Sequence, residues 1–119
     1  MSLVSIALIA LIAALHFYIL WFEMFAWESR GPKVFRSFPK DMFAPTKTMA
    51  ANQGLYNGFL AAGLVWALLI SDPIWARNVA VFFLLCVFVA GLYGAATASK
   101  RIFYVQALPA VLALVSLFL

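Results

Sequence analysis

Four long stretches without a charged residue restrict most strongly what this chain can fold into. They cover residues 1–22, 48–71, 78–99 and 102–119. A helix that crosses a bilayer needs about 20 apolar residues, whereas a transmembrane strand would alternate apolar and polar residues, which these stretches do not. Hydrophobic residues make up 67% of the 119 residues and charged residues only 10%. Because so small a domain cannot bury that much apolar surface, we predict an all-α integral membrane protein.

The polar clusters between these stretches set the boundaries of the predicted helices. We expect one integral membrane domain, residues 1–119, built as an antiparallel bundle of four transmembrane helices at about 3–27, 47–70, 73–97 and 100–119. In the turn before the third helix, Asp72 should cap the helix and Pro73 suits its first position. Pro109 lies inside the last predicted helix, so we expect a kink there.

The first apolar stretch lacks a basic amino end and a small-residue cleavage site, so we interpret it as a retained helix and not as a signal peptide. Cys86 is the single cysteine, which excludes an internal disulfide and a cysteine metal centre. His16 and Glu23 alone provide too few ligands for a metal ion. We therefore predict no metal, and the sequence identifies no cofactor.

Basic residues gather on one predicted side of the membrane. Segment 28–47 and turn 98–101 hold seven of the eight, namely Arg30, Lys33, Arg36, Lys40, Lys47, Lys100 and Arg101. The opposite side has Arg77 alone. By the positive-inside rule, loop 28–46 should face the cytoplasm, and both termini should face the outer side of the cytoplasmic membrane. Because orientation accounts for the net charge of +4, we predict no nucleic-acid partner.

The long loop allows two interpretations. Phe35, Phe38 and Met42 follow one another at helical spacing, with basic residues between them. Such a segment is typical of an amphipathic helix that lies flat among the lipid headgroups. An irregular loop with a few anchoring aromatic residues would have the same sequence, and both alternatives stay open.

Polar residues inside the predicted helices lie at similar depths. Glu23, Asn52 and Gln106 are each five residues from a charged residue at the predicted cytoplasmic edge, namely Glu28, Lys47 and Arg101. Five residues correspond to about 7 Å at the helical rise per residue. Gln53 and Tyr93 lie near that level. Polar and ionisable residues inside a membrane are functional by default. We therefore predict a ligand-binding pocket in the cytoplasmic half of the bundle.

Helical spacing supports this pocket. His16 lies about 10 Å deeper than Glu23 on the same face of its helix, because the two are seven residues apart. Asn57 almost reaches the depth of His16, four residues beyond Gln53. The predicted ligand-binding residues are His16, Glu23, Asn52, Gln53, Asn57, Tyr93 and Gln106.

Each of these residues also has a structural explanation. Glu23 can reach the headgroups or pair with Lys47 or Arg101, the amides can join helices, and one neighbour can satisfy His16. Small residues support close helix packing: Gly54 and Gly58 are four apart, and GLYGAA at 91–96 repeats the pattern.

The stretches LHFYILWFEMFAW, RGPKVF and ANQGLYNGFLAAGL resemble the domain-of-unknown-function 1304 family of short integral membrane proteins, over nearly the whole chain. The resemblance implies four membrane helices and no established activity. The polar positions that match the family's pattern are His16, Glu23, Asn52, Gln53 and Asn57. No catalytic residue carries over.

Three functions follow from these patterns. The first is binding or transport of a small molecule, in which Glu23 handles charge and His16 and the amides bind the ligand. The second is a membrane enzyme acting on a lipid, quinone or isoprenoid, with Glu23 and His16 as an acid–base pair. The third is a structural or accessory subunit, so whether the protein is an enzyme stays open. Expected partners are the lipid bilayer, a small-molecule or lipid ligand, and further copies of the chain, because four helices make a thin pathway.

Overall fold

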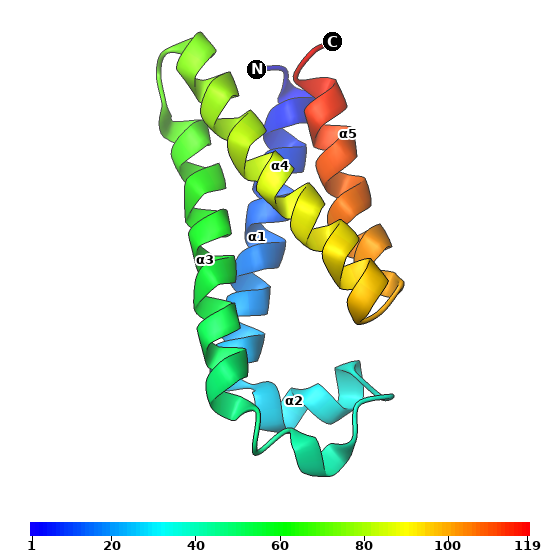
Figure 1. Cartoon of the computed structure of the whole chain (residues 1–119). Helices are drawn as coiled ribbons and strands as arrows, with labels where there is room; N and C mark the ends of the chain where they lie inside the picture. Colours follow the sequence, from blue (N-terminus) through cyan, green and yellow to red (C-terminus); the bar gives the residue numbers. More distant parts are fainter. The chain divides into compact units, whose positions relative to one another are not determined.

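The computed structural model describes all residues from 1 to 119 and contains helices and turns only, which confirms the all-α class. Figure 1 labels the α-helices along the chain. The elements in order are α1 (Leu3–Phe25), α2 (Trp27–Val34), the 3-10 helix η1 (Lys40–Met42), α3 (Lys47–Leu69), α4 (Pro73–Thr97), the π-helical segment η2 (Phe103–Ala107) and α5 (Leu108–Ser116).

The chain forms two compact units. The first contains Met1–Ala14 and Leu60–Leu119, and the second contains Leu15–Phe59. Helices α1 and α3 each contribute residues to both units. The second unit holds Glu23 and all three amides of α3, whereas Tyr93 and Gln106 belong to the first.

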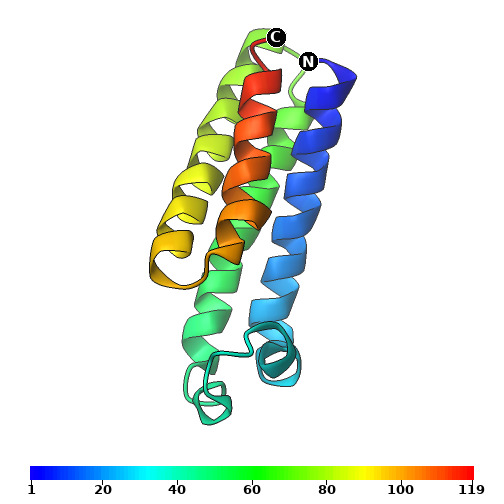
Figure 2. The same ribbon diagram turned by 90° about the vertical axis from the view of Figure 1, so that its right-hand side faces the viewer.

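The first unit has an apolar core to which α1, α3, α4 and α5 all contribute. Its buried residues include Ile9 of α1, Leu64 of α3, Leu84 of α4 and Ala110 of α5. Helix α4 packs along η2 and α5, which run beside it in Figures 1 and 2. A Cβ atom on Gly91 would lie 2.6 Å from the backbone nitrogen of Ala107. Only glycine fits there, which confirms close packing through the small residues that begin at Gly91.

The start of α4 follows the predicted turn chemistry. Asp72 Oδ1 accepts hydrogen bonds from the backbone nitrogens of Ile74 at 2.9 Å and of Trp75 at 3.4 Å. Pro73 occupies the first helical position, where its missing N–H is no loss. The predicted cap is therefore confirmed.

Pro109 distorts the last helical stretch in a specific way. Proline has no N–H to donate, and its ring would collide with the carbonyl group four residues earlier, that of Val105. The preceding turns widen into η2, in which the Leu108 backbone N–H donates to the Phe103 carbonyl oxygen. The expected disturbance is thus a π-helical segment, a known way of accommodating such a position.

The segment after α1 differs from both interpretations of the long loop. Helix α1 ends at Phe25 and the short helix α2 begins at Trp27, so a bend at Ala26 replaces the expected continuous helix. The interpretation as one amphipathic helix through Phe35, Phe38 and Met42 is wrong, because α2 ends at Val34 and only η1 follows. The loop is nevertheless not simply irregular, since its aromatic rings pack together.

Two helices, α1 and α4, are long and apolar enough to cross a membrane. Only 28% of the most apolar stretch of α1 and 22% of that of α4 is buried, whereas the core helix of a water-soluble protein is mostly buried. The apolar stretch Phe103–Ser116 is shorter. Helix α3 matches α1 in length, with 23 residues, but its first half carries the polar amides.

Candidate functional site

Glu23 is the acidic side chain that the fold buries, with 8% of its surface exposed. Its Oε1 accepts a hydrogen bond of 2.9 Å from Asn57 Nδ2, across the contact between α1 and α3 in the second unit. The same nitrogen donates to the Gln53 carbonyl oxygen at 3.1 Å. An amide nitrogen has two protons, and both are used here. The Asn57 side chain is therefore held both by Glu23 and by the backbone of its own helix.

The second carboxylate oxygen of Glu23 is in a different position. Oε2 accepts no hydrogen bond within the chain, yet it is not one of the polar atoms sealed inside the protein. Buried carboxylates normally have their oxygens satisfied. Glu23 therefore has one oxygen held by the protein and one that reaches the surface.

Glycines bring the two helices close enough for this pair. A Cβ atom on Gly54 would lie 2.9 Å from Glu23 Cβ and 3.1 Å from the Leu20 carbonyl oxygen. A Cβ atom on Gly58 would lie 2.3 Å from Leu20 Cδ1. A side chain at Gly54 would push the helices apart, and one at Gly58 would require the Leu20 side chain to move, so the expectation that Gly54 and Gly58 are packing residues is confirmed.

His16 is completely buried. It precedes Glu23 by two helical turns on α1, which is a rise of about 10 Å. The shared face therefore does not make the two side chains a hydrogen-bonded pair. An acid–base pair of His16 and Glu23 would need a substrate or water to join them.

The other predicted amides face outward. The side chains of Asn52 and Gln53 are exposed, and with Thr48, Met49 and Tyr56 they line an open hollow of about 550 Å³ on α3. Asn57 alone turns toward α1. Similar depth along a helix does not imply a common direction, because adjacent residues are about 100° apart around its axis.

The first unit holds the two remaining predicted residues. Tyr93 of α4 has 72% of its surface exposed, and Gln106 is half-buried within the π-helical segment. Within the second unit, the structure brings Glu23 and Asn57 together, whereas Asn52 and Gln53 face outward. The ligand-binding roles of these residues stay predictions.

An aromatic cluster around Trp27 is a feature that the sequence patterns missed. The Trp27 ring lies 5.1 Å from that of Phe43, 5.8 Å from Phe22, 6.0 Å from Phe35 and 6.1 Å from Phe38, measured between centroids. Its Nε1–H donates to Thr46 Oγ1 at 3.0 Å. Trp27 thus forms the centre of a packed cluster.

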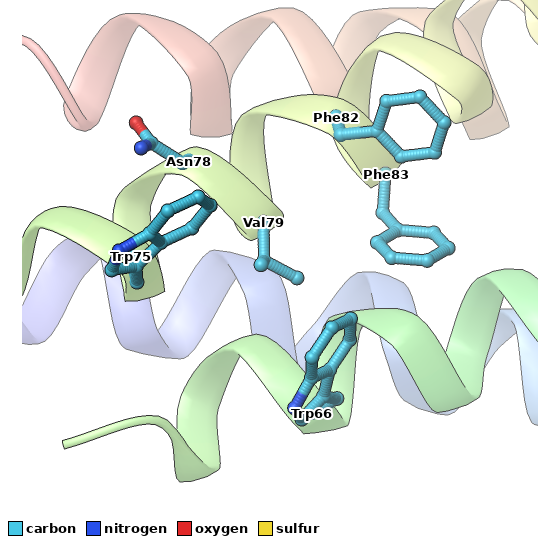
Figure 3. Close-up of a pocket in the computed structure, with 6 residues that line it drawn as sticks. All are labelled: Trp66, Trp75, Asn78, Val79, Phe82 and Phe83. Carbon is cyan, nitrogen blue, oxygen red and sulfur yellow. The ribbon is translucent and has the colours of Figure 1, made fainter. Parts of the chain in front are cut away.

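A second hollow, of about 280 Å³, lies between α3 and α4 in the first unit (Figure 3). Its walls are almost entirely apolar, and the side chain of Asn78 points away from Trp66 at the opposite side. The lining residues are Trp66, Trp75, Asn78, Val79, Phe82 and Phe83. Without a converging polar group, this hollow offers no chemistry beyond apolar contact.

A metal ion would find few ligands in this chain. No three His, Cys, Asp or Glu side chains come together. A tightly bound zinc ion takes three or four such ligands, so Glu23 would need ligands from another molecule.

These features define a helical protein with two helices able to cross a membrane and a buried carboxylate–amide pair. The chain belongs to the family described as protein of unknown function (DUF1304), whose sequence profile matches residues 10–118. The resemblance inferred from its motifs is thereby confirmed. The chain is 32% identical over 120 residues to "Uncharacterized protein YpaA" of Lactococcus lactis subsp. lactis (strain IL1403), and the match covers 99% of each chain. No solved structure matches.

Proposed function

We propose that the chain is a multi-pass protein of the cytoplasmic membrane that binds a small molecule at Glu23 and passes it into or through the bilayer. Its four spans would be α1, α3, α4 and the η2–α5 stretch. Two of these are long and apolar enough to cross a membrane. Because seven of the eight basic residues gather in 28–47 and 98–101, loop 28–46 would be cytoplasmic and both termini outside.

The single observation that carries this proposal is the environment of Glu23. A carboxylate within a span is costly, and such residues usually mark the path of an ion or substrate. Asn57 holds Oε1, while Oε2 keeps access to the surface without a partner in the chain. The free oxygen suits a ligand that donates hydrogen bonds or carries positive charge, such as a protonated amine.

The nearby amides fit a supporting role. Asn57 positions the carboxylate, and the exposed side chains of Asn52 and Gln53 offer both donors and acceptors one turn nearer the cytoplasmic end of α3. His16, Tyr93 and Gln106 stay candidate contacts of the ligand. In a transport cycle, a proton and the ligand would compete for Glu23.

We also propose that the functional unit is a homo-oligomer that pairs through α3. Exposed amides facing lipid are unfavourable, and they favour association between membrane helices. Asn52 and Gln53 are self-complementary, since each amide both donates and accepts. A second copy related by a two-fold axis would therefore satisfy them.

The test compares three purified proteins in mild detergent: the wild type, Glu23→Gln and the control Glu28→Gln. Glu28 is an exposed carboxylate that pairs with Lys47 at 3.4 Å, so its replacement removes the same charge outside the site. Co-purified small molecules are identified by mass spectrometry, and thermal unfolding is recorded in parallel. We expect a compound that the wild type and Glu28→Gln retain and Glu23→Gln loses, with little change in stability.

The alternatives give other outcomes. A structural or accessory subunit would show the same bound compounds in all three proteins and only a lower stability in Glu23→Gln. An enzyme would convert a compound in a lipid extract, and Glu23→Gln would not. The distance of about 10 Å along α1 between His16 and Glu23 gives the enzyme less support than binding or transport.

A further inference from the structure

Segment 27–46, together with Lys47, displays positive charge that the rest of the chain does not neutralise. Residues 28–47 contain five basic residues, Arg30, Lys33, Arg36, Lys40 and Lys47, and two acidic ones, Glu28 and Asp41, which gives +3 of the chain's net charge of +4. The ion pair of the structure joins Lys47 and Glu28. The basic groups of α2 and of the turns after it form no ion pair.

Three of these basic side chains, Lys33, Arg36 and Lys40, are exposed and form no ion pair. Arg30 lies over the Tyr18 ring, 5.9 Å from its centroid, and its charge is likewise not neutralised. Together they form a cationic surface, defined here as Arg30, Lys33, Arg36 and Lys40.

Aromatic packing explains why these cations point outward. Phe43 is buried, with 2% of its surface exposed. Its ring packs directly on Gly31, where an added Cβ atom would lie 2.3 Å from the ring. Phe38 packs on Phe43 with ring centroids 4.9 Å apart. Because the aromatic side chains fill the inside of the segment, the basic side chains that alternate with them remain on its outside.

The segment also sits next to a candidate membrane span. Helix α2 begins two residues after α1 ends at Phe25, and α3 begins at Lys47. Both ends are thus tied to long helices of the same unit. In Figures 1 and 2, α2 turns away from the direction of α1 and runs across it. If α1 crosses the bilayer, α2 lies along the surface of the bilayer. The cations are then within a Debye length of the lipid phosphates.

We propose that the cationic surface binds the headgroups of anionic phospholipids such as phosphatidylglycerol. This inference rests on the membrane location in the proposed function and not on a ligand at Glu23. Lysine and arginine near an anionic leaflet each strengthen binding, and the guanidinium of arginine donates two parallel hydrogen bonds to a phosphate. The aromatic cluster holds the cations in a folded segment, so less entropy is lost on binding.

The test uses the full chain in mild detergent and two charge-matched double variants. Lys33→Gln/Arg36→Gln removes one lysine and one arginine from the cationic surface. Lys100→Gln/Arg101→Gln removes the same pair of residue types from the other basic turn, where both side chains are also exposed. Binding of phosphatidylglycerol and of phosphatidylcholine is measured by native mass spectrometry over a range of lipid concentrations.

We expect the wild type to prefer phosphatidylglycerol. The first variant should bind it about 25-fold more weakly, at about fivefold per cation, and the control should change less than about threefold. Phosphatidylcholine binding should be equal in all proteins. Equal losses in both variants, or no loss in the first, would overturn the proposal, because the charge would then act without regard to its position.

Two further measurements separate this proposal from folding and from the Glu23 site. Circular dichroism of the first variant should match that of the wild type. Glu23→Gln should keep the preference for phosphatidylglycerol even where it loses a small-molecule ligand. A lipid preference that disappears with Glu23→Gln would contradict a separate surface and assign the lipid to the Glu23 site.

Discussion

Asn57 uses both protons of its side-chain nitrogen to hold one residue in place: Nδ2 donates to Glu23 Oε1 at 2.9 Å and to its own helix, at the Gln53 carbonyl oxygen, at 3.1 Å. The bond joins α1 to α3 where Gly54 removes the bulk between them. A buried carboxylate is thus fixed on one oxygen and open on the other, which is unusual for a purely structural residue.

Removal of Asn57 tests how strongly the pair is coupled. Asn57→Leu leaves the buried carboxylate without its donor and should lower the free energy of unfolding by about 1–3 kcal/mol. The double variant Glu23→Leu/Asn57→Leu removes both polar groups and should recover most of that loss. Equilibrium unfolding in detergent measures both. If the double variant loses as much free energy of unfolding as the two single variants lose when their losses are added, the two residues are independent.

Substitution of the two glycines should give unequal results. At Gly54 a new methyl group meets the Cβ of Glu23 and a backbone oxygen, which cannot move far. Gly54→Ala should therefore lower the free energy of unfolding by about 1–3 kcal/mol. At Gly58 the nearest atom is the flexible end of Leu20, and alanine favours helix by about 1 kcal/mol, so Gly58→Ala should be nearly neutral. Thermal unfolding ranks the two, and the reverse order would contradict the packing described here.

Single cysteines test the topology. In a Cys86→Ser background, Ser37→Cys lies between α2 and η1, Ser71→Cys between α3 and α4, and Ser99→Cys after α4. A membrane-impermeant thiol reagent on intact cells should label only the cysteine at position 71. The other two should react after the cells are opened. Labelling of all three in intact cells, or recovery of the protein in the soluble fraction, would contradict four spans with the long loop inside.

Pairing through α3 can be measured by disulfide cross-linking in the same background. Tyr56→Cys, on the proposed interface, should form a dimer on oxidation in the membrane, because residues near a two-fold axis face their own copies. Val89→Cys on α4 is the control. The two native side chains are equally open, with 60% and 61% of their surface exposed. Equal cross-linking at both positions would indicate random collisions and no α3 interface.

The sequence predicted the helical class, the cap at Asp72 and the close packing at Gly54 and Gly58. These features depend on local chemistry or on residue size, which a sequence displays directly. The depth arithmetic placed Glu23 level with Asn52, whereas the amide that contacts it is Asn57. It could not tell that Asn57 turns toward α1 while Asn52 and Gln53 face outward, because direction around a helix depends on which neighbour packs there.

Two features of the fold were beyond the sequence patterns. Phe35, Phe38 and Met42 follow a helical period, yet contacts of Trp27 with Phe35, Phe38 and Phe43 outweigh that local preference. At Pro109 the sequence indicated a disturbance but not its form. A sharp kink and a π-helical turn can both accommodate proline inside a helix, so the sequence alone does not distinguish them.

The most direct measurement is the reaction of membranes with dicyclohexylcarbodiimide, a lipid-soluble reagent that modifies carboxyl groups in apolar surroundings, followed by peptide mass spectrometry. The chain has four carboxylate side chains, and Glu28, Asp41 and Asp72 are all exposed. We expect modification at Glu23 alone, its loss in Glu23→Gln and its persistence in Glu28→Gln. Modification confined to the exposed carboxylates, with Glu23 unreactive, would contradict a lipid-buried carboxylate that stays open to a ligand.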